Sequence, residues 1–198
     1  MRIVAGRYKG HRLPALRGRN TRPTMDRVRE AVFSSIGPAV QGARVLELFA
    51  GTGAFGFEAL SRGAEFAIFV DRDRKVADLI AQTARTLGVS RLVTIWTCSA
   101  AQAVKRLTAD VEQFDLMFLD PPYEGSQISG LLSDRILPNL LSPGGLLVVE
   151  RGSTVAALSV PAELERRFDR RYGGTQVEIF RKQSLTESSP REPGEAYE

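Results

Sequence analysis

The stretch from Arg44 to Gly56 constrains the fold of this chain more than any other part of the sequence. Residues 44–49 form a short, mainly apolar run typical of a strand buried on both faces, and residues 50–56 follow with three glycines. A helical pattern then continues to about Arg62. A strand, a glycine turn and a helix in this order form a cradle for a nucleotide-type cofactor in parallel α/β sheets.

Later apolar runs extend this pattern. Four of them fit buried strands: residues 66–71, 92–96, 116–119 and 146–150. Two more segments, residues 168–172 and 176–180, are joined by Gly173-Gly174 and predict an antiparallel hairpin at the sheet edge. We therefore predict an α/β fold: a doubly wound, Rossmann-like sheet, mostly parallel, with the cofactor at the carboxyl ends of the strands.

The two ends of the chain differ from this body in composition. Loose alternation near the N-terminus, with glycines at positions 6 and 10, predicts a short β-ribbon followed by a polar link and a helix ending at Gly37-Pro38. Residues 184–198 contain almost no apolar side chains, which predicts a disordered tail. We expect a ribbon and link over residues 1–23, a cofactor-binding domain over 24–182, and the tail from 183 onward.

Basic residues are concentrated at the N-terminus. The first 29 residues hold nine basic side chains and one acidic side chain, a net charge of +8 in a chain whose total is +4. Such an uneven distribution is typical of proteins that bind nucleic acid, although a solubilising terminus is the simpler alternative. The predicted nucleic-acid contacts are Arg7, Lys9, Arg12, Arg22, Arg27 and Arg29.

Several functional classes are not expected. No apolar run approaches the 18 to 20 or so residues that span a membrane, and no apolar signal core follows Met1-Arg2, so we expect a cytoplasmic protein. Cys98 is the single cysteine and His11 the single histidine, which excludes an internal disulfide and makes a transition-metal site unexpected.

The glycine turn fits two cofactors. Gly51, Gly53 and Gly56 match G-x-G-x-x-G, which also occurs in dinucleotide-binding dehydrogenases. Asp71 ends the next strand, where a carboxylate holds ribose hydroxyls in either case. Glu47 favours S-adenosylmethionine, because a carboxylate attracts its cationic methionine moiety and repels a pyrophosphate. The chain also lacks a second domain large enough for a hydride-transfer substrate site.

Nine residues are the predicted cofactor contacts. They come from the first strand, the glycine turn, the end of the second strand and the exit of the third strand: Glu47, Phe49, Gly51, Thr52, Gly53, Asp71, Arg72, Ser99 and Ala100. Ser99 is the candidate for holding the adenine ring, and an ordinary helix start is the alternative interpretation of this position.

Asp120-Pro121-Pro122-Tyr123 is the predicted catalytic segment. It follows the apolar run 116–119, and the prolines force the backbone out of the sheet and hold it rigidly. The Asp120 carboxylate and a proline carbonyl can accept the two hydrogens of an exocyclic amine and aim its lone pair at an electrophile. Tyr123 can stack on a flipped or single-stranded base. A plain proline-rich turn is the structural alternative.

Residues 22–33, Arg-Pro-Thr-Met-Asp-Arg-Val-Arg-Glu-Ala-Val-Phe, closely resemble the signature of the RsmD family of 16S ribosomal RNA guanine-N2 methyltransferases. The resemblance extends from the N-terminal glycines to about Lys182, and Met25 departs from it where the family has Thr or Ser. It implies methyl transfer from S-adenosylmethionine to the N2 amine of guanine 966 in partly assembled small ribosomal subunits. From the residues alone, methylation of adenine or protein glutamine, and a non-catalytic RNA-binding assembly factor, stay open.

Overall fold

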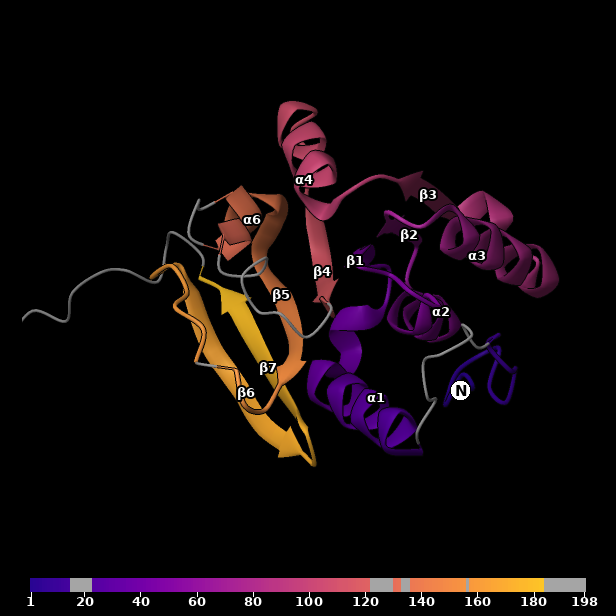
Figure 1. Cartoon of the computed structure of the whole chain (residues 1–198), viewed down its shortest axis with the longest axis horizontal. Coiled ribbons are helices and arrows are strands. Elements are labelled where there is room, and N and C mark those ends of the chain that lie inside the picture. The colour runs from indigo at the N-terminus through magenta and orange to yellow at the C-terminus, as the bar shows by residue number, and fades with distance from the viewer. Residues whose placement is uncertain (15–22, 122–129, 133–135, 156, 184–198) are drawn as a thin grey trace, which may run out of the picture.

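The protein forms one seven-stranded sheet with helices on both faces (Figure 1). The structure is a computed structural model that describes residues 1–14, 23–121, 130–132, 136–155 and 157–183. The strands follow one another in the sheet in the order β3-β2-β1-β4-β5-β7-β6. Their bounds are β1 (Arg44–Leu48), β2 (Phe66–Asp71), β3 (Val93–Thr97), β4 (Phe114–Leu119), β5 (Leu141–Gly152), β6 (Leu164–Tyr172) and β7 (Thr175–Lys182).

The pairing of the strands confirms the predicted fold class. Strands β1 to β5 pair in parallel, and β7 runs antiparallel to both β5 and β6. Strand β1 lies near the centre, between β2 and β4, so the order reverses beside it. Ligands in open α/β sheets bind at such a reversal, outside the carboxyl ends of the strands.

Helices cover the two faces of the sheet unequally. Their bounds are α1 (Pro23–Ile36), η1 (Gly37–Val40), α2 (Ala54–Ser61), α3 (Arg74–Leu87), η2 (Ser90–Leu92), α4 (Ala100–Ala109) and α6 (Ile136–Leu140). Apolar residues of α1, α2 and α3 share one buried cluster with β1, β4 and β5, whereas those of α4 and α6 share the cluster on the opposite face. Because side chains alternate along a strand, each central strand contributes to both clusters.

Strand β5 begins earlier than the sequence predicts. The sequence predicts a strand over residues 146–150, but the strand starts at Leu141, which pairs with Phe114. The next pair joins Leu116 to Leu146, so the register shifts over the Ser-Pro-Gly-Gly stretch. Residues 142–145 therefore form an irregularity within β5, because the strand pairs with β4 both before and after them.

The N-terminal segment is a part of the core. The predicted ribbon is reduced to a single bridge between Arg2 and Arg12, while Ile3 and Leu13 are buried in the cluster on the α1–α3 face. The backbone N–H of Arg7 donates to the Ser61 carbonyl at 2.7 Å. Gly6 has a φ of 81°, and a Cβ there would lie 1.9 Å from the Ser61 oxygen, so only glycine permits this approach of the segment to α2.

Candidate active site

The glycine turn between β1 and α2 has the backbone geometry that the sequence predicts. Gly51 and Gly53 adopt φ values of 54° and 71°, and Gly53 immediately precedes α2. A Cβ on Gly56 would lie 2.4 Å from the Phe69 ring and 2.8 Å from Glu47 Oε2. Two glycines thus shape the turn, and the third lets α2 lie close to β1 and β2.

Glu47 lies beneath this turn with almost no exposure. Its Oε2 accepts from the N–H of Gly56 at 2.8 Å and its Oε1 from the N–H of Phe55 at 3.2 Å. Burial raises the pKa of Glu47 to about 8, the two amide bonds oppose the rise, and the nearby Asp120 carboxylate adds to it. A cation next to Glu47 would reverse much of this shift, because it stabilises the carboxylate form.

Asp71 joins the end of β2 to the glycine turn. Its Oδ2 accepts from the N–H of Gly51 at 3.0 Å, and its Oδ1 from the N–H of Asp73 at 3.0 Å. The neighbouring Arg72 is exposed. On the turn itself, Phe49 has a positive φ of 59°, and Thr52 Oγ1 lies 3.6 Å from the sulfur of Met1. The structure therefore brings these predicted contacts together at one edge of the sheet.

Ser99 forms the N-terminal cap of α4. The N–H of Gln102 donates to Ser99 Oγ at 3.2 Å, and the N–H of Ser99 donates to Gln102 Oε1 at 3.1 Å, which completes a capping box. The ordinary helix start that the sequence left open is thus confirmed. Contact of Ser99 and of the buried Ala100 with an adenine ring stays a prediction.

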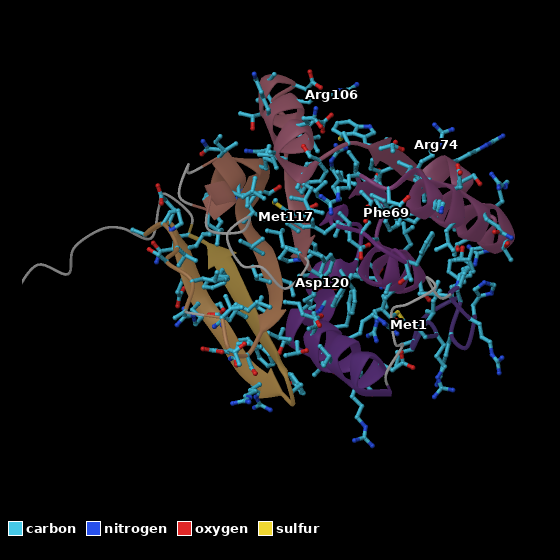
Figure 2. The ribbon with its side chains drawn as sticks, in the orientation of Figure 1. Met1, Phe69, Arg74, Arg106, Met117 and Asp120 are labelled. Atoms are coloured by element: carbon cyan, nitrogen blue, oxygen red, sulfur yellow. The ribbon has the colours of Figure 1, made fainter. Side chains whose placement is uncertain are left out.

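Asp120 follows the last residue of β4, at the carboxyl edge of the sheet (Figure 2). It is half-buried, and Pro121 is buried. The rest of the predicted catalytic segment, Pro122 and Tyr123, lies outside the described residues, as does Arg22. Asp120 acts electrostatically on Glu47, so the predicted catalytic and cofactor-binding carboxylates belong to one site.

The sequence interpretation missed Glu150. This residue lies near the end of β5, directly beyond Val149, which pairs with Leu119 of β4. Burial and the Asp120 carboxylate raise the pKa of Glu150 to about 8, and Arg29 opposes the rise. An acid that ends the apolar run 146–150 is the same signal as Asp71 at the end of its run, so the sequence did contain a hint.

Arg29 corrects the predicted RNA contacts. Its side chain is 2% exposed and pairs with Asp26 at 2.9 Å and with the buried Glu58 at 3.4 Å. It also donates to the carbonyl of Arg2. Arg29 precedes Phe33 by four residues and so shares the buried face of α1. The prediction that it contacts RNA is wrong, whereas the side chains of Arg7, Lys9, Arg12 and Arg27 are exposed.

The described part of the chain contains neither a membrane-spanning helix nor a metal-type cluster. Among these residues, no helix is long and apolar enough to cross a membrane. No group of three or more His, Cys, Asp or Glu side chains there has the arrangement of a metal site.

The comparisons with known proteins identify the family. Residues 1–181 match the family model described as "Conserved hypothetical protein 95". The chain is 32% identical over 196 residues to Ribosomal RNA small subunit methyltransferase D of Escherichia coli K12. The alignment covers 95% of this chain and 93% of that protein. The chain belongs to the RsmD family. The family resemblance of residues 22–33 is thereby confirmed.

Further members and neighbours agree with this family and fold. Ribosomal RNA small subunit methyltransferase D of Haemophilus influenzae is 35% identical over 159 residues, with 76% of this chain and 78% of that protein covered. The solved structure of yhhF from Escherichia coli is 28% identical with a TM-score of 0.81, over 92% of this chain and 98% of that one. A Salinibacter ruber RNA methyltransferase solved with S-adenosyl-L-homocysteine has a TM-score of 0.60 at 17% identity, a likeness of fold alone.

Proposed function

We propose that the protein is a 16S rRNA (guanine(966)-N(2))-methyltransferase, which transfers a methyl group from S-adenosyl-L-methionine to the exocyclic N2 amine of a guanine. The observation that carries the proposal is the position of Asp120 and Pro121 directly after β4, near enough to Glu47 beneath the glycine turn for the Asp120 charge to raise the pKa of Glu47. The RsmD-family relatives named as small-subunit ribosomal RNA methyltransferases support the choice of substrate. We further propose that the protein acts in the cytoplasm on partly assembled small subunits.

The residues around the glycine turn fit S-adenosylmethionine. The turn has no room for a Cβ at Gly56, and the acid below it, Glu47, is a buried carboxyl group, which suits a cation better than a pyrophosphate. Glu47 would face the cationic methionine moiety, and Asp71 would accept from the ribose hydroxyls. When bound, this cofactor supplies an electrophilic methyl group.

Asp120 and Pro121 would activate the amine. The lone pair of a guanine N2 amine is delocalised into the ring, so the amine is a poor nucleophile. The Asp120 carboxylate and the Pro121 carbonyl can accept its two hydrogens, which favours positive charge on nitrogen and directs the lone pair out of the ring plane. Pro121 is buried, and each of the two residues that supply the acceptors is followed by a proline in the sequence, which restricts its backbone and limits its movement before the base arrives.

The decisive experiment compares ribosomal RNA from cells with and without this protein. In a strain that lacks this protein, mass spectrometry should show that 16S rRNA has lost N2-methylguanosine at position 966. Reintroducing the gene should restore the modified nucleoside. An unchanged methylation pattern contradicts the proposal. Methylated adenine or methylated protein glutamine that disappears in the same strain would instead support the alternative substrates, and loss of neither would favour a non-catalytic assembly factor.

Asp71→Ala tests the cofactor site. We expect it to weaken S-adenosylmethionine binding by about 1.5 to 3 kcal/mol, because two charge-assisted hydrogen bonds to the ribose are lost. Isothermal calorimetry measures the affinity. Asp73→Ala is the control, since Asp73 caps α3 through Lys75 two residues away and carries no proposed ligand contact. An unchanged affinity in Asp71→Ala, or tighter binding of NAD by the parent, contradicts the cofactor assignment.

The exposed basic residues of the N-terminal segment should bind RNA phosphates. Replacing Arg7, Lys9 and Arg12 with Ala should weaken RNA binding and flatten its salt dependence by roughly 2 to 3 log units per log unit of salt, because each phosphate contact contributes about 0.7 to 0.9. Fluorescence anisotropy over a salt series measures both quantities, and cofactor affinity should stay close to that of the parent.

The matched control removes three exposed charges elsewhere. Arg91, Lys105 and Arg106 lie beside β3 and on α4, which covers the opposite face of the sheet, so their replacement with Ala should change the salt slope little. Melting temperatures of both triple variants establish that they fold. If the N-terminal variant keeps the parent's RNA affinity and slope, Arg7, Lys9 and Arg12 do not contact RNA and serve only solubility.

A further inference from the structure

Glu150 and Asp120 lie side by side at the carboxyl edge of the sheet. Strands β4 and β5 pair in parallel, and their last pair joins Leu119 to Val149, so the residues that follow, Asp120 and Glu150, are neighbours. Adjacent strands lie about 4.8 Å apart. Their two carboxyl groups therefore start from adjacent backbone positions.

Both side chains project from the face of the sheet that α1 and α2 cover. Phe118 and Val148, two residues before Asp120 and Glu150, belong to the buried cluster on that face, and side chains two residues apart share a face. Glu47 is on the same side, since its neighbours Leu46 and Leu48 belong to the opposite cluster. The Glu150 side chain thus faces the same space as the catalytic Asp120 and the proposed methionine site.

The charges around Glu150 are unequal. Asp120 opposes ionisation of Glu150, while Arg29 of α1 favours it. Arg29 is already held by Asp26 and Glu58, at 2.9 and 3.4 Å, so it acts on Glu150 from a fixed position. Glu150 is half-buried rather than fully enclosed, so a base that reaches Asp120 can also reach its neighbour.

We propose that Glu150 determines the specificity for guanine by accepting the N1–H of the target base while Asp120 accepts from its N2 amine. This inference rests on the proposed function. Guanine presents N1–H and N2–H as adjacent parallel donors on one edge, and two neighbouring carboxyl groups offer adjacent acceptors. Adenine has an acceptor at N1. In the same position this N1 would face the Glu150 carboxylate, and no hydrogen would lie between the two acceptors.

The base 2-aminopurine isolates this contact. It keeps an exocyclic amine at position 2 but has an acceptor at N1, so it can receive the methyl group and cannot donate to Glu150. We would place guanine or 2-aminopurine at the target position by ligation of 16S rRNA fragments, reconstitute small-subunit particles, and measure methyl transfer from labelled S-adenosylmethionine. A pH of about 8.5 ionises most of Glu150, whose pKa burial and Asp120 raise to about 8 while Arg29 opposes the rise, and it leaves the N1–H of guanine in place.

The parent protein should prefer guanine by about 100-fold, and Glu150→Gln should reduce this preference at least about tenfold, because an amide can donate to an N1 acceptor. Glu150→Asp keeps the charge, but its shorter side chain moves the carboxylate away from the base. Its preference for guanine should therefore lie between those of the parent and Glu150→Gln. 2-Aminopurine also differs from guanine by lacking O6. This difference is the same for the parent and the variants, so it cancels when their guanine to 2-aminopurine ratios are compared. Glu30→Gln, an exposed acid on α1, is the control and should keep the parent's ratio.

Two results would overturn the proposal in distinguishable ways. If all variants keep the parent's ratio while the parent methylates guanine, Glu150 does not read N1 and the proposed function stands. If the parent methylates neither base, the proposed function fails and the inference fails with it. Cofactor affinity and melting temperature of each variant establish that a changed ratio comes from base recognition, and Glu150→Asp keeps the test open should Glu150→Gln not fold.

Discussion

Asp120→Ala should lower methyl transfer at saturating RNA about 100-fold or more. This is the usual scale for removing one preorganised electrostatic group that acts on the transition state. S-adenosylmethionine should bind nearly as well as to the parent, because the ribose and the methionine moiety are assigned to Asp71 and Glu47. Single-turnover transfer of a labelled methyl group to small-subunit particles measures the rate, and calorimetry measures the cofactor affinity.

Asp120→Asn is the matched variant for this prediction. Its amide keeps one acceptor oxygen without the charge, so it should retain more activity than Asp120→Ala. Removal of the Asp120 charge should also lower the pKa values of Glu47 and Glu150, since that charge opposes their ionisation. Equal transfer rates for Asp120→Ala and the parent would remove Asp120 from the mechanism.

Glu58→Ala should destabilise the protein by about 3 to 5 kcal/mol, the range for breaking a buried ion pair by removing one partner. Glu58 is fully buried, and its Oε2 accepts from the N–H of Val4 at 2.7 Å as well as from Arg29. Its Oε1 accepts from the N–H of Ala5 at 3.0 Å. The substitution would leave two backbone amides and a buried guanidinium without this acceptor.

Thermal and urea unfolding measure this loss. For a chain of this size, each kcal/mol lowers the melting temperature by about 2 to 4 °C, so a decrease of roughly 10 °C is expected. Glu112→Ala is the control, because Glu112 pairs with Arg44 at the surface, where an ion pair contributes about 1 kcal/mol or less. A loss in Glu58→Ala no larger than in the control would contradict the structural role of Glu58.

Most of the sheet was predictable because buried parallel strands leave a strong local signal. The strands that end at Leu48, Asp71 and Leu119 were found from their composition alone, with a difference of one or two residues at some ends, since both faces of these strands are covered. The first residues of β5 were not predicted to be part of a strand. The Ser-Pro-Gly-Gly sequence favours a turn, and only pairing with β4 extends the strand to Leu141.

The site residues that lie close together in the sequence were predictable. The glycines of the turn and Asp71 were found because their spacing is fixed by one strand–turn–helix unit. Arg29 was misassigned because its partner Glu58 is 29 residues away, and the charge of an arginine does not reveal what lies opposite it. Glu150 was overlooked because its significance depends on the strand beside it, and the lateral order of strands is a tertiary property.

The contacts of the N-terminal segment imply a particular order of events during synthesis. Val4, Ala5 and Tyr8 bond to residues of α2 that are 53 or 54 positions later in the chain, so the segment leaves the ribosome well before its partners. Strand β1 waits longer still, because its pair β4 follows about 70 residues behind, as in the bond from Arg44 to Asp115. Long-range pairing of this kind slows folding, so the basic N-terminal segment stays without these partners until α2 has been synthesised.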